Sequence, residues 1–155
     1  MTPARLVAPR PVSGPIARVA GALPRLLLVA AIVSCAETAP AFDASSVQVV
    51  VELRDYQVVP SAATMKAGTA RIGVRNRGAQ PHDLTILRTQ TAPDRLPVDG
   101  SSAKAREDGL VARQPELRAG GSARLDVTLE PGAYVLICNV PGHYQLGMRT
   151  ALTVE

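Results

Sequence analysis

Residues 133–155 decide the fold, and they read AYVLICNVPGHYQLGMRTALTVE. The opening AYVLIC is nearly all apolar, as expected of a central strand that is buried on both faces. The closing RTALTVE is a second strand-like stretch. The connection between them carries Cys138, His143 and Met148, at Cys-x4-His-x4-Met spacing. The segment predicts two strands joined by a loop that brings a thiol, an imidazole and a thioether together.

Upstream of this segment, strand-like stretches alternate with turn signals. The stretches are VQVVVEL (47–53), YQVV (56–59), TARIGVRN (69–76), DLTIL (83–87) and SARLDVTL (122–129). Glycine-containing turns separate several of them, at 66–68, 77–78, 120–121 and 131–132. Pro60 is expected at an edge strand or a strand end. Seven or eight short strands in about 110 residues predict one all-β domain over 47–155, a sandwich or a barrel.

Residues 89–109 interrupt this pattern with two prolines, two glycines and few large apolar residues. This composition predicts a long surface excursion with a helical turn around 101–107, followed by a short strand at 110–112. Two further side chains are assigned structural roles: Tyr134 is expected to bond backbone through its hydroxyl, and Met65 to serve packing.

The N-terminus has the features of an export signal. Residues 1–34 contain four arginines and no acidic residue, and end in the apolar run LLLVAAIV before Ser34-Cys35. The apolar run is too short to span a bilayer. The sequence around Cys35 resembles a lipobox, in which this cysteine becomes the lipidated first residue. The alternative is ordinary signal cleavage, after Ala36 or after the triplet at 39–41. Small and polar residues at 35–46 predict a flexible tether.

The charge balance depends on this signal. The chain has 17 basic and 13 acidic residues, a net charge of +4. Removing the four arginines before Cys35 leaves 13 basic residues against 13 acidic ones. The exported domain is therefore expected to be electrically neutral, which argues against binding to nucleic acid.

The metal-binding side chains form a small and suggestive set. The chain has two histidines, of which His82 stands at the mouth of the strand that follows Pro81. Without Cys35, Cys138 is the one remaining thiol, and a free thiol in an exported protein is an oxidation risk unless it binds something. Two imidazoles, a thiolate and a weak thioether are the ligand set of a mononuclear electron-transfer copper site. Zinc is the competing metal, but thioether ligation is not typical of zinc.

The chain resembles the cupredoxins, the blue copper proteins, over roughly 47–155. Three stretches carry the resemblance: 56–87 with its Lys-Ala-Gly turn, Asn-x-Gly and histidine; LEPGAYVLIC at 129–138; and CNVPGHYQLGM at 138–148. The four-residue gap between cysteine and histidine is similar to that of longer-loop members such as rusticyanin and auracyanin. The resemblance implies a Greek-key β-sandwich that binds one type 1 copper ion.

Site residues follow from the resemblance by position. It implies His82, Cys138 and His143 as equatorial ligands and Met148 as the axial ligand. Asn76 and Asp83 are expected beside the ligands. In many members an asparagine occupies the position of Asp83, so its backbone bond to the cysteine sulfur is expected to persist while a side-chain brace is in question. A partner-docking patch is expected around His143, and it would comprise Val140, Pro141, Tyr144 and Leu146.

Several functions are compatible with such a site. We expect a monomeric, exported one-electron carrier in the periplasm or at the cell surface, which meets redox proteins transiently and takes no small-molecule substrate. A copper-handling protein that delivers or buffers the ion is the main alternative, and a small oxidoreductase is a third. Four protein ligands leave no open position for a substrate, and no catalytic constellation is left over, so no enzyme is expected.

Overall fold

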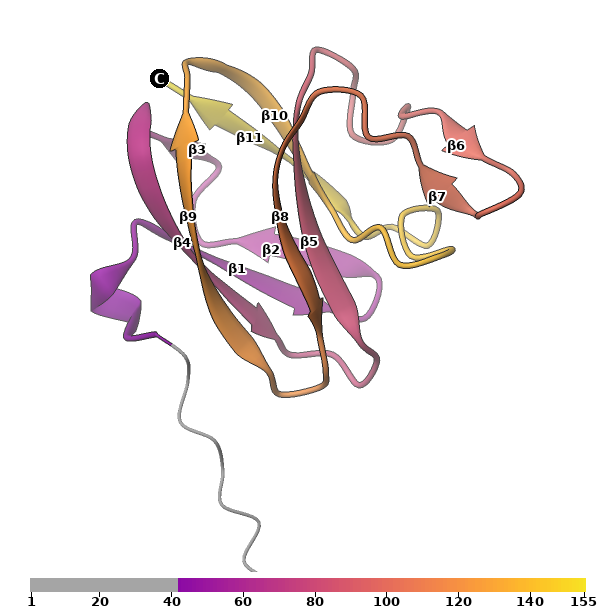
Figure 1. The fold of residues 1–155 in the computed structure, drawn as a ribbon, viewed down its shortest axis with the longest axis horizontal. Coiled ribbons are helices and arrows are strands. Elements are labelled where there is room, and N and C mark those ends of the chain that lie inside the picture. Colours follow the sequence, from indigo (N-terminus) through magenta and orange to yellow (C-terminus); the bar gives the residue numbers. More distant parts are fainter. Residues whose placement is uncertain (1–41) are drawn as a thin grey trace, which may run out of the picture. The chain divides into compact units, whose positions relative to one another are not determined.

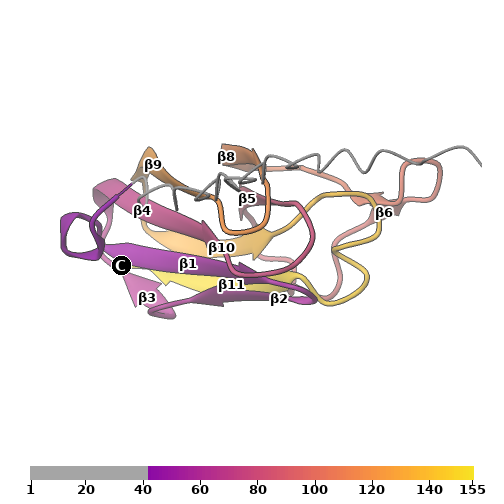
Figure 2. The same cartoon turned by 90° about the horizontal axis from the view of Figure 1, so that it is seen from below.

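Apolar residues at alternate strand positions build two β-sheets, whose apolar faces pack together as a sandwich (Figures 1 and 2). The computed structural model describes residues 42–155. The predicted signal segment 1–34 and the lipidation site Cys35 lie outside the described residues. The prediction of an all-β sandwich is confirmed.

The first sheet has four strands, in the order β2–β1–β4–β9. They are β2 (Gln57–Pro60), β1 (Val49–Arg54), β4 (Gly68–Asn76) and β9 (Ser122–Leu129). The second sheet has the order β3–β11–β10–β5–β8. Its strands are β3 (Thr64–Met65), β11 (Arg149–Val154), β10 (Gly132–Ile137), β5 (His82–Arg88) and β8 (Leu110–Leu117). Both sheets are mixed, because β1 pairs with β4 and β3 pairs with β11 in parallel.

Outside the two sheets lie a hairpin of β6 (Val98–Asp99) and β7 (Lys104–Ala105), and a single 3₁₀ turn, η1 (Ala44–Ser46). Eight of the eleven strands in the described part of the chain have four residues or more, which matches the seven or eight strands that the sequence predicts.

The main core lies between the sheets and is almost entirely aliphatic, as a chain with one Phe and three Tyr requires. Tyr134 and Leu136 of β10 face this core, as does Cys138 directly after the strand. The alternate residues Val135 and Ile137 are buried on the opposite face, in a second cluster with Leu87, Leu96, Ala105 and Tyr144. Strand β10 is therefore buried on both faces, as predicted.

The second cluster corrects the prediction for residues 89–109. The predicted helical turn around 101–107 is wrong, because these residues include β7 and the turn that joins it to β6. The excursion also does more than cross the surface: Leu96 and Ala105 are buried in the cluster on the outer face of β10. Only two residues of the excursion pack on β10, and the rest are mostly polar, so its composition gave no sign that it contributes to the core.

The strand after the excursion is longer than predicted. Strand β8 runs over Leu110–Leu117 instead of 110–112. It forms one edge of the second sheet and is mostly exposed, so polar residues at 113, 114 and 116 and the proline at 115 are tolerated there. An edge strand of this kind lacks the apolar alternation from which buried strands are predicted.

Three smaller predictions are confirmed. The Tyr134 hydroxyl donates to the carbonyl of Glu130 at 2.8 Å and accepts from its amide at 3.1 Å. Pro60 ends β2, which is an edge strand. Met65 is half-buried and packs against the main core.

The predicted tether at 35–46 is wrong over residues 42–46. Phe42 is buried, and the guanidinium carbon of Arg75 lies 4.8 Å from the centre of its ring. Asp43 then caps η1 by accepting from the amide of Ser45. A single aromatic residue in a small, polar stretch attaches the chain to the sandwich. None of the helices in residues 42–155 has the length and hydropathy that a membrane crossing needs.

The burial of Leu96 gives a test of the excursion's role. We expect Leu96→Ala to lower the free energy of unfolding of the metal-free protein by about 2–3 kcal/mol, because it leaves a cavity over β10. Leu110→Ala is the matched control, since this leucine is exposed and its loss should cost less than about 0.5 kcal/mol. Denaturant unfolding measures both. Equal effects of the two variants would show that the excursion does not belong to the core.

Candidate metal centre

The loop between β10 and β11 is held at both ends and within. The amide of Cys138 donates to the carbonyl of Met148 at 3.0 Å, which closes the loop at its base. Inside the loop, the amides of His143 and Met148 donate to the carbonyls of Val140 and His143 at 3.0 and 3.1 Å. Gly142 has φ +84, a conformation that favours glycine, and so makes the bend that the Pro141-Gly142 pair predicts. These bonds hold the backbone that carries His143.

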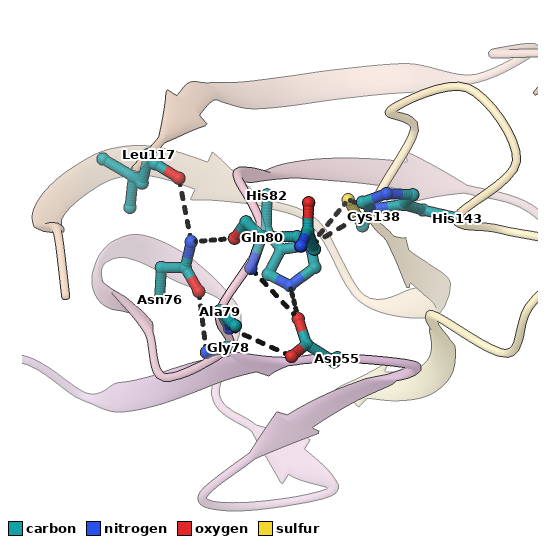
Figure 3. A network of polar contacts seen from close by, with 9 residues as sticks. All are labelled: Asp55, Asn76, Gly78, Ala79, Gln80, His82, Leu117, Cys138 and His143. Atoms are coloured by element: carbon teal, nitrogen blue, oxygen red, sulfur yellow. Dashed lines mark hydrogen bonds and ion pairs between the residues drawn. The ribbon is translucent and has the colours of Figure 1, made fainter. Parts of the chain in front are cut away.

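The second histidine, His82, lies beside this loop although it comes from β5. His82 begins β5, is 1% exposed, and directs Nδ1 toward the loop (Figure 3). Its Nδ1 lies 3.1 Å from Nδ1 of His143 and 3.7 Å from Sγ of Cys138. Nδ1 of His143 lies 3.4 Å from the same sulfur. The two imidazoles and the thiol therefore converge on one point, although His82 and Cys138 are 56 residues apart.

The spacing of these atoms fits one small metal ion. Three atoms bound in a plane around an ion at about 2.0–2.3 Å lie roughly 3.5–4 Å from one another. The three observed separations, 3.1, 3.4 and 3.7 Å, are close to this value. The shell is also chemically right for copper, which takes two imidazoles and one thiolate in a trigonal arrangement.

Met148 completes the set from the base of the loop. It is 1% exposed, packs in the main core with Cys138, and lines a cleft beside the two histidines. This cleft has a volume of about 300 Å³. Its lining comprises Asp55, Tyr56, Gln80, His82, His143, Leu146 and Met148.

Burial dominates the electrostatics of the thiol. Desolvation raises the pKa of Cys138 from 9.0 to about 12, against the opposing effect of hydrogen bonds from the backbone amides of Val140 and Asp83. Between pH 9.0 and about 12, the metal-free folded protein keeps the Cys138 thiol protonated, whereas the thiol of the unfolded chain ionises. This contribution to the stability of the metal-free fold is present below pH 9.0 and is lost as the pH rises toward about 12.

Burial acts in the opposite sense on the histidine of the loop. Desolvation, with a further contribution from the nearby His82, lowers the pKa of His143. The His143 ring is therefore neutral at pH 7, and a neutral imidazole has the lone pair that a metal requires.

The side chain of Asp83 contacts the backbone directly after the cysteine. Its Oδ1 accepts from the amide of Asn139 at 2.5 Å, directly after the cysteine. Asn139 in turn exchanges two hydrogen bonds with the backbone of Ala105, at 2.8 and 3.0 Å. The amide of Gly142 donates to the carbonyl of Ala103 at 2.8 Å. The excursion thus holds the ligand loop as well as covering β10.

Asn76 lies one step further from the ligands. Its side-chain amide donates to the carbonyls of Gln80 and Leu117, and its Oδ1 accepts from the amide of Gly78 at 2.8 Å (Figure 3). It therefore orders the turn that leads from β4 into His82.

Asp55 contacts a ligand of this site, and the sequence did not predict it. Its Oδ1 lies 3.0 Å from Nε2 of His82, on the side of the ring away from the cysteine (Figure 3). Its two oxygens also accept from the amides of Ala79 and Gln80, at 3.0 and 3.3 Å. The amide of Ala79 is the main reason that the pKa of Asp55 is lowered. The parallel pairing of β1 with β4 is the signal that could have found it, because it places the residue after β1 beside the turn after β4.

The predicted docking residues do not all reach the surface. Leu146 is 59% exposed, Pro141 is exposed and Val140 is half-buried. Tyr144 is only 3% exposed, so its assignment to the patch is wrong. Its hydroxyl donates to the carbonyl of Pro93 and accepts from the amide of Leu96, which ties the ligand loop to the excursion. Tyr56, which is 61% exposed and also lines the cleft, was not predicted.

Comparison with known proteins agrees with this fold. The family model of the cupredoxin-like domain matches residues 25–154. Dithionite-reduced auracyanin from the photosynthetic bacterium Roseiflexus castenholzii is similar in structure, with 22% identity, a TM-score of 0.52, and coverage of 68% of this chain and 94% of auracyanin. Reduced rusticyanin has 18% identity, a TM-score of 0.51, and coverage of 69% of this chain and 77% of rusticyanin. No curated protein matches the chain.

The family match extends over most of the chain, and the converging donor atoms lie in the domain that it covers. The chain belongs to the family of cupredoxin-like domains, and His82, Cys138, His143 and Met148 form its type 1 copper site.

Proposed function

We propose that the chain is a one-electron carrier between redox proteins. The observation that supports this most directly is the closed, pre-arranged ligand set: one donor atom from β5 and two from a loop held by backbone hydrogen bonds lie within 4.8 Å of one another. Copper in such a site changes between its two oxidation states and so supplies a one-electron couple. The hydrogen bonds resist movement of the ligands, and a site that moves little exchanges electrons with little rearrangement.

The carrier is proposed to act without a substrate of its own. Four side chains from the protein close the shell, so no ligand position is left for a substrate. Within residues 42–155, the group of His82, Cys138 and His143 is the one cluster of His, Cys, Asp and Glu side chains suited to a metal. A copper-delivery protein would have to release its ion, whereas the buried thiol and the bonded loop favour retention.

The proposed place of action is outside the cytoplasm, in the periplasm or at the cell surface. The support comes from the sequence: the basic and apolar segment 1–34, and Cys35 as the candidate for lipidation. Retention at a membrane by this lipid would keep the carrier close to membrane-bound partners.

The central test is spectroscopic and electrochemical. We expect the copper-loaded domain to be intensely blue, to cycle reversibly by one electron in voltammetry, and to exchange electrons rapidly with a small inorganic oxidant. Cys138→Ser should abolish the blue band, because the thiolate is the strong equatorial ligand. Rapid transfer of copper from the domain to a chelator, with no reversible couple, would contradict the carrier and favour copper delivery.

Copper binding should release a proton from the thiol. Because the pKa of Cys138 is raised to about 12, its side chain is a protonated thiol at pH 7 in the metal-free protein. It must lose this proton to bind the metal as a thiolate. We expect Cys138 to release about one proton for each copper ion bound. Because of this release, the affinity for copper should rise about tenfold for each unit of pH. Calorimetry in two buffers of different ionisation enthalpy measures the release. A release that is the same in Cys138→Ser would show that the thiol does not ionise on binding.

The partner-docking surface is proposed to lie around the cleft. Leu146 and Tyr56 are both more than half exposed on its walls, beside His143. An apolar contact that excludes water beside a ligand would bring a partner's redox centre close, and a neutral domain would rely on shape more than on charge.

Electron self-exchange between two copies of the domain tests this surface. We expect Leu146→Ser to slow the second-order exchange rate measured by NMR line broadening, with little change of the potential, because the contact loses apolar area. Leu110→Ser is the matched control, as this leucine is 49% exposed on β8. Equal rates in the two variants would exclude Leu146 from the docking surface.

A further inference from the structure

We propose that Asp55 is a positioning residue of the copper site, which holds His82 in the Nε2–H tautomer and lowers the reduction potential through its charge. The proposal rests on the copper site of the proposed carrier. Its starting observation is the geometry of one ring: Nδ1 of His82 faces the thiol and the other imidazole, while Nε2 faces a carboxylate oxygen at 3.0 Å (Figure 3).

The tautomer follows from this arrangement. A carboxylate accepts hydrogen bonds and does not donate them, so Nε2 must carry the proton if the 3.0 Å contact is a hydrogen bond. Nδ1 then has a free lone pair, and it is the nitrogen directed at the site. Outer partners of this kind orient a ligating histidine and raise its basicity.

Asp55 is itself held in place by three contacts. Besides His82, it accepts from the amides of Ala79 and Gln80 in the turn before β5. It stands in a two-residue connection between β1 and β2, where Arg54 pairs with Gln57. The other residue of this connection, Tyr56, has φ +69, which is unusual for a bulky side chain and persists only where the surroundings hold it. Asp55 directly precedes this residue, and its side chain is bonded to the turn before β5.

The approach of the turn to this pair requires glycine. A Cβ at Gly78 would lie 2.5 Å from Oδ1 of Asp55 and 2.6 Å from Nε2 of His82, inside the van der Waals limit for both. Asn76 fixes Gly78 in this position by accepting from its amide. The absence of a side chain at Gly78 thus leaves room for the contact between the Asp55 carboxylate and the His82 ring.

The direction of the effect on the potential follows from charge. The oxidised site carries one more positive charge than the reduced site, and a carboxylate at the edge of a ligand ring favours the more positive state. The Asp55 side chain is 34% exposed, so water screens part of this interaction. The carboxylate therefore lowers the potential relative to a neutral side chain of the same shape.

Asp55→Asn tests the charge while keeping the shape. We expect copper binding to weaken at least tenfold, as for other outer-sphere partners. If the affinity for the oxidised ion falls tenfold more than that for the reduced ion, the potential rises by about 59 mV, the value of a tenfold change for one electron. The matched control is Asp126→Asn, which removes a carboxylate on β9 that pairs with Arg124. Equal potentials of the two variants would overturn the electrostatic role.

A second measurement addresses the tautomer without metal and covers a variant that fails to fold. Two-bond ¹H–¹⁵N correlations of the metal-free wild-type domain should show His82 as Nε2–H, and Gly78→Ala should change this signal by separating the ring from the carboxylate. An Nδ1–H tautomer in the wild type would overturn the proposal. Slow electron exchange would contradict the carrier instead, and would leave both the tautomer and the potential shift as measured.

Discussion

The hydrogen bond from the amide of Cys138 to the carbonyl of Met148 is the constraint on which the site depends. It closes the loop between β10 and β11 at the point where the two strands leave the sheet, so the first and last ligands of the loop face one another across the base. Everything between them must then form tight turns, and the bend at Gly142 directs His143 back toward the sulfur. A ligand set of this compactness needs only one further side chain, and β5 supplies it at its first residue.

The two sides of the site are built differently. On one side, the excursion of residues 89–109 contacts the ligand loop through Asn139, Gly142 and Tyr144, and buries apolar residues over β10. On the other side, the cleft exposes Tyr56 and Leu146 beside the histidines, and Asp55 provides the polar contact. The first arrangement excludes water and prevents movement, whereas the second leaves a short route between the ligands and the surface.

The sequence predicted the features that are local and could not predict those that depend on topology. The ligand loop was predictable because its three ligands lie within one short segment between two strands. His82 was predictable because it lies at the start of a strand and is the only histidine besides His143. Asp55 is 27 residues from His82, and only the parallel pairing of β1 with β4 brings the two together. Tyr144 was assigned to the surface because its partners, Pro93 and Leu96, lie in a stretch whose composition gives no sign of burial.

The roles of Asp83 and Asp55 show how position decides what a carboxylate does at such a site. Asp83 follows His82 directly, and its Oδ1 accepts a hydrogen bond from the amide of Asn139, so it acts on the backbone next to the cysteine. Asp55 comes from another strand and reaches the ring of a ligand itself, so its charge acts on the ligand's electrons as well as on its orientation. The charge of Asp83 also reaches two ligands, because it favours the protonated forms of Cys138 and His143. Asp55 differs from Asp83 in contacting a ligand ring directly, at 3.0 Å, so its charge is part of the balance between the two oxidation states.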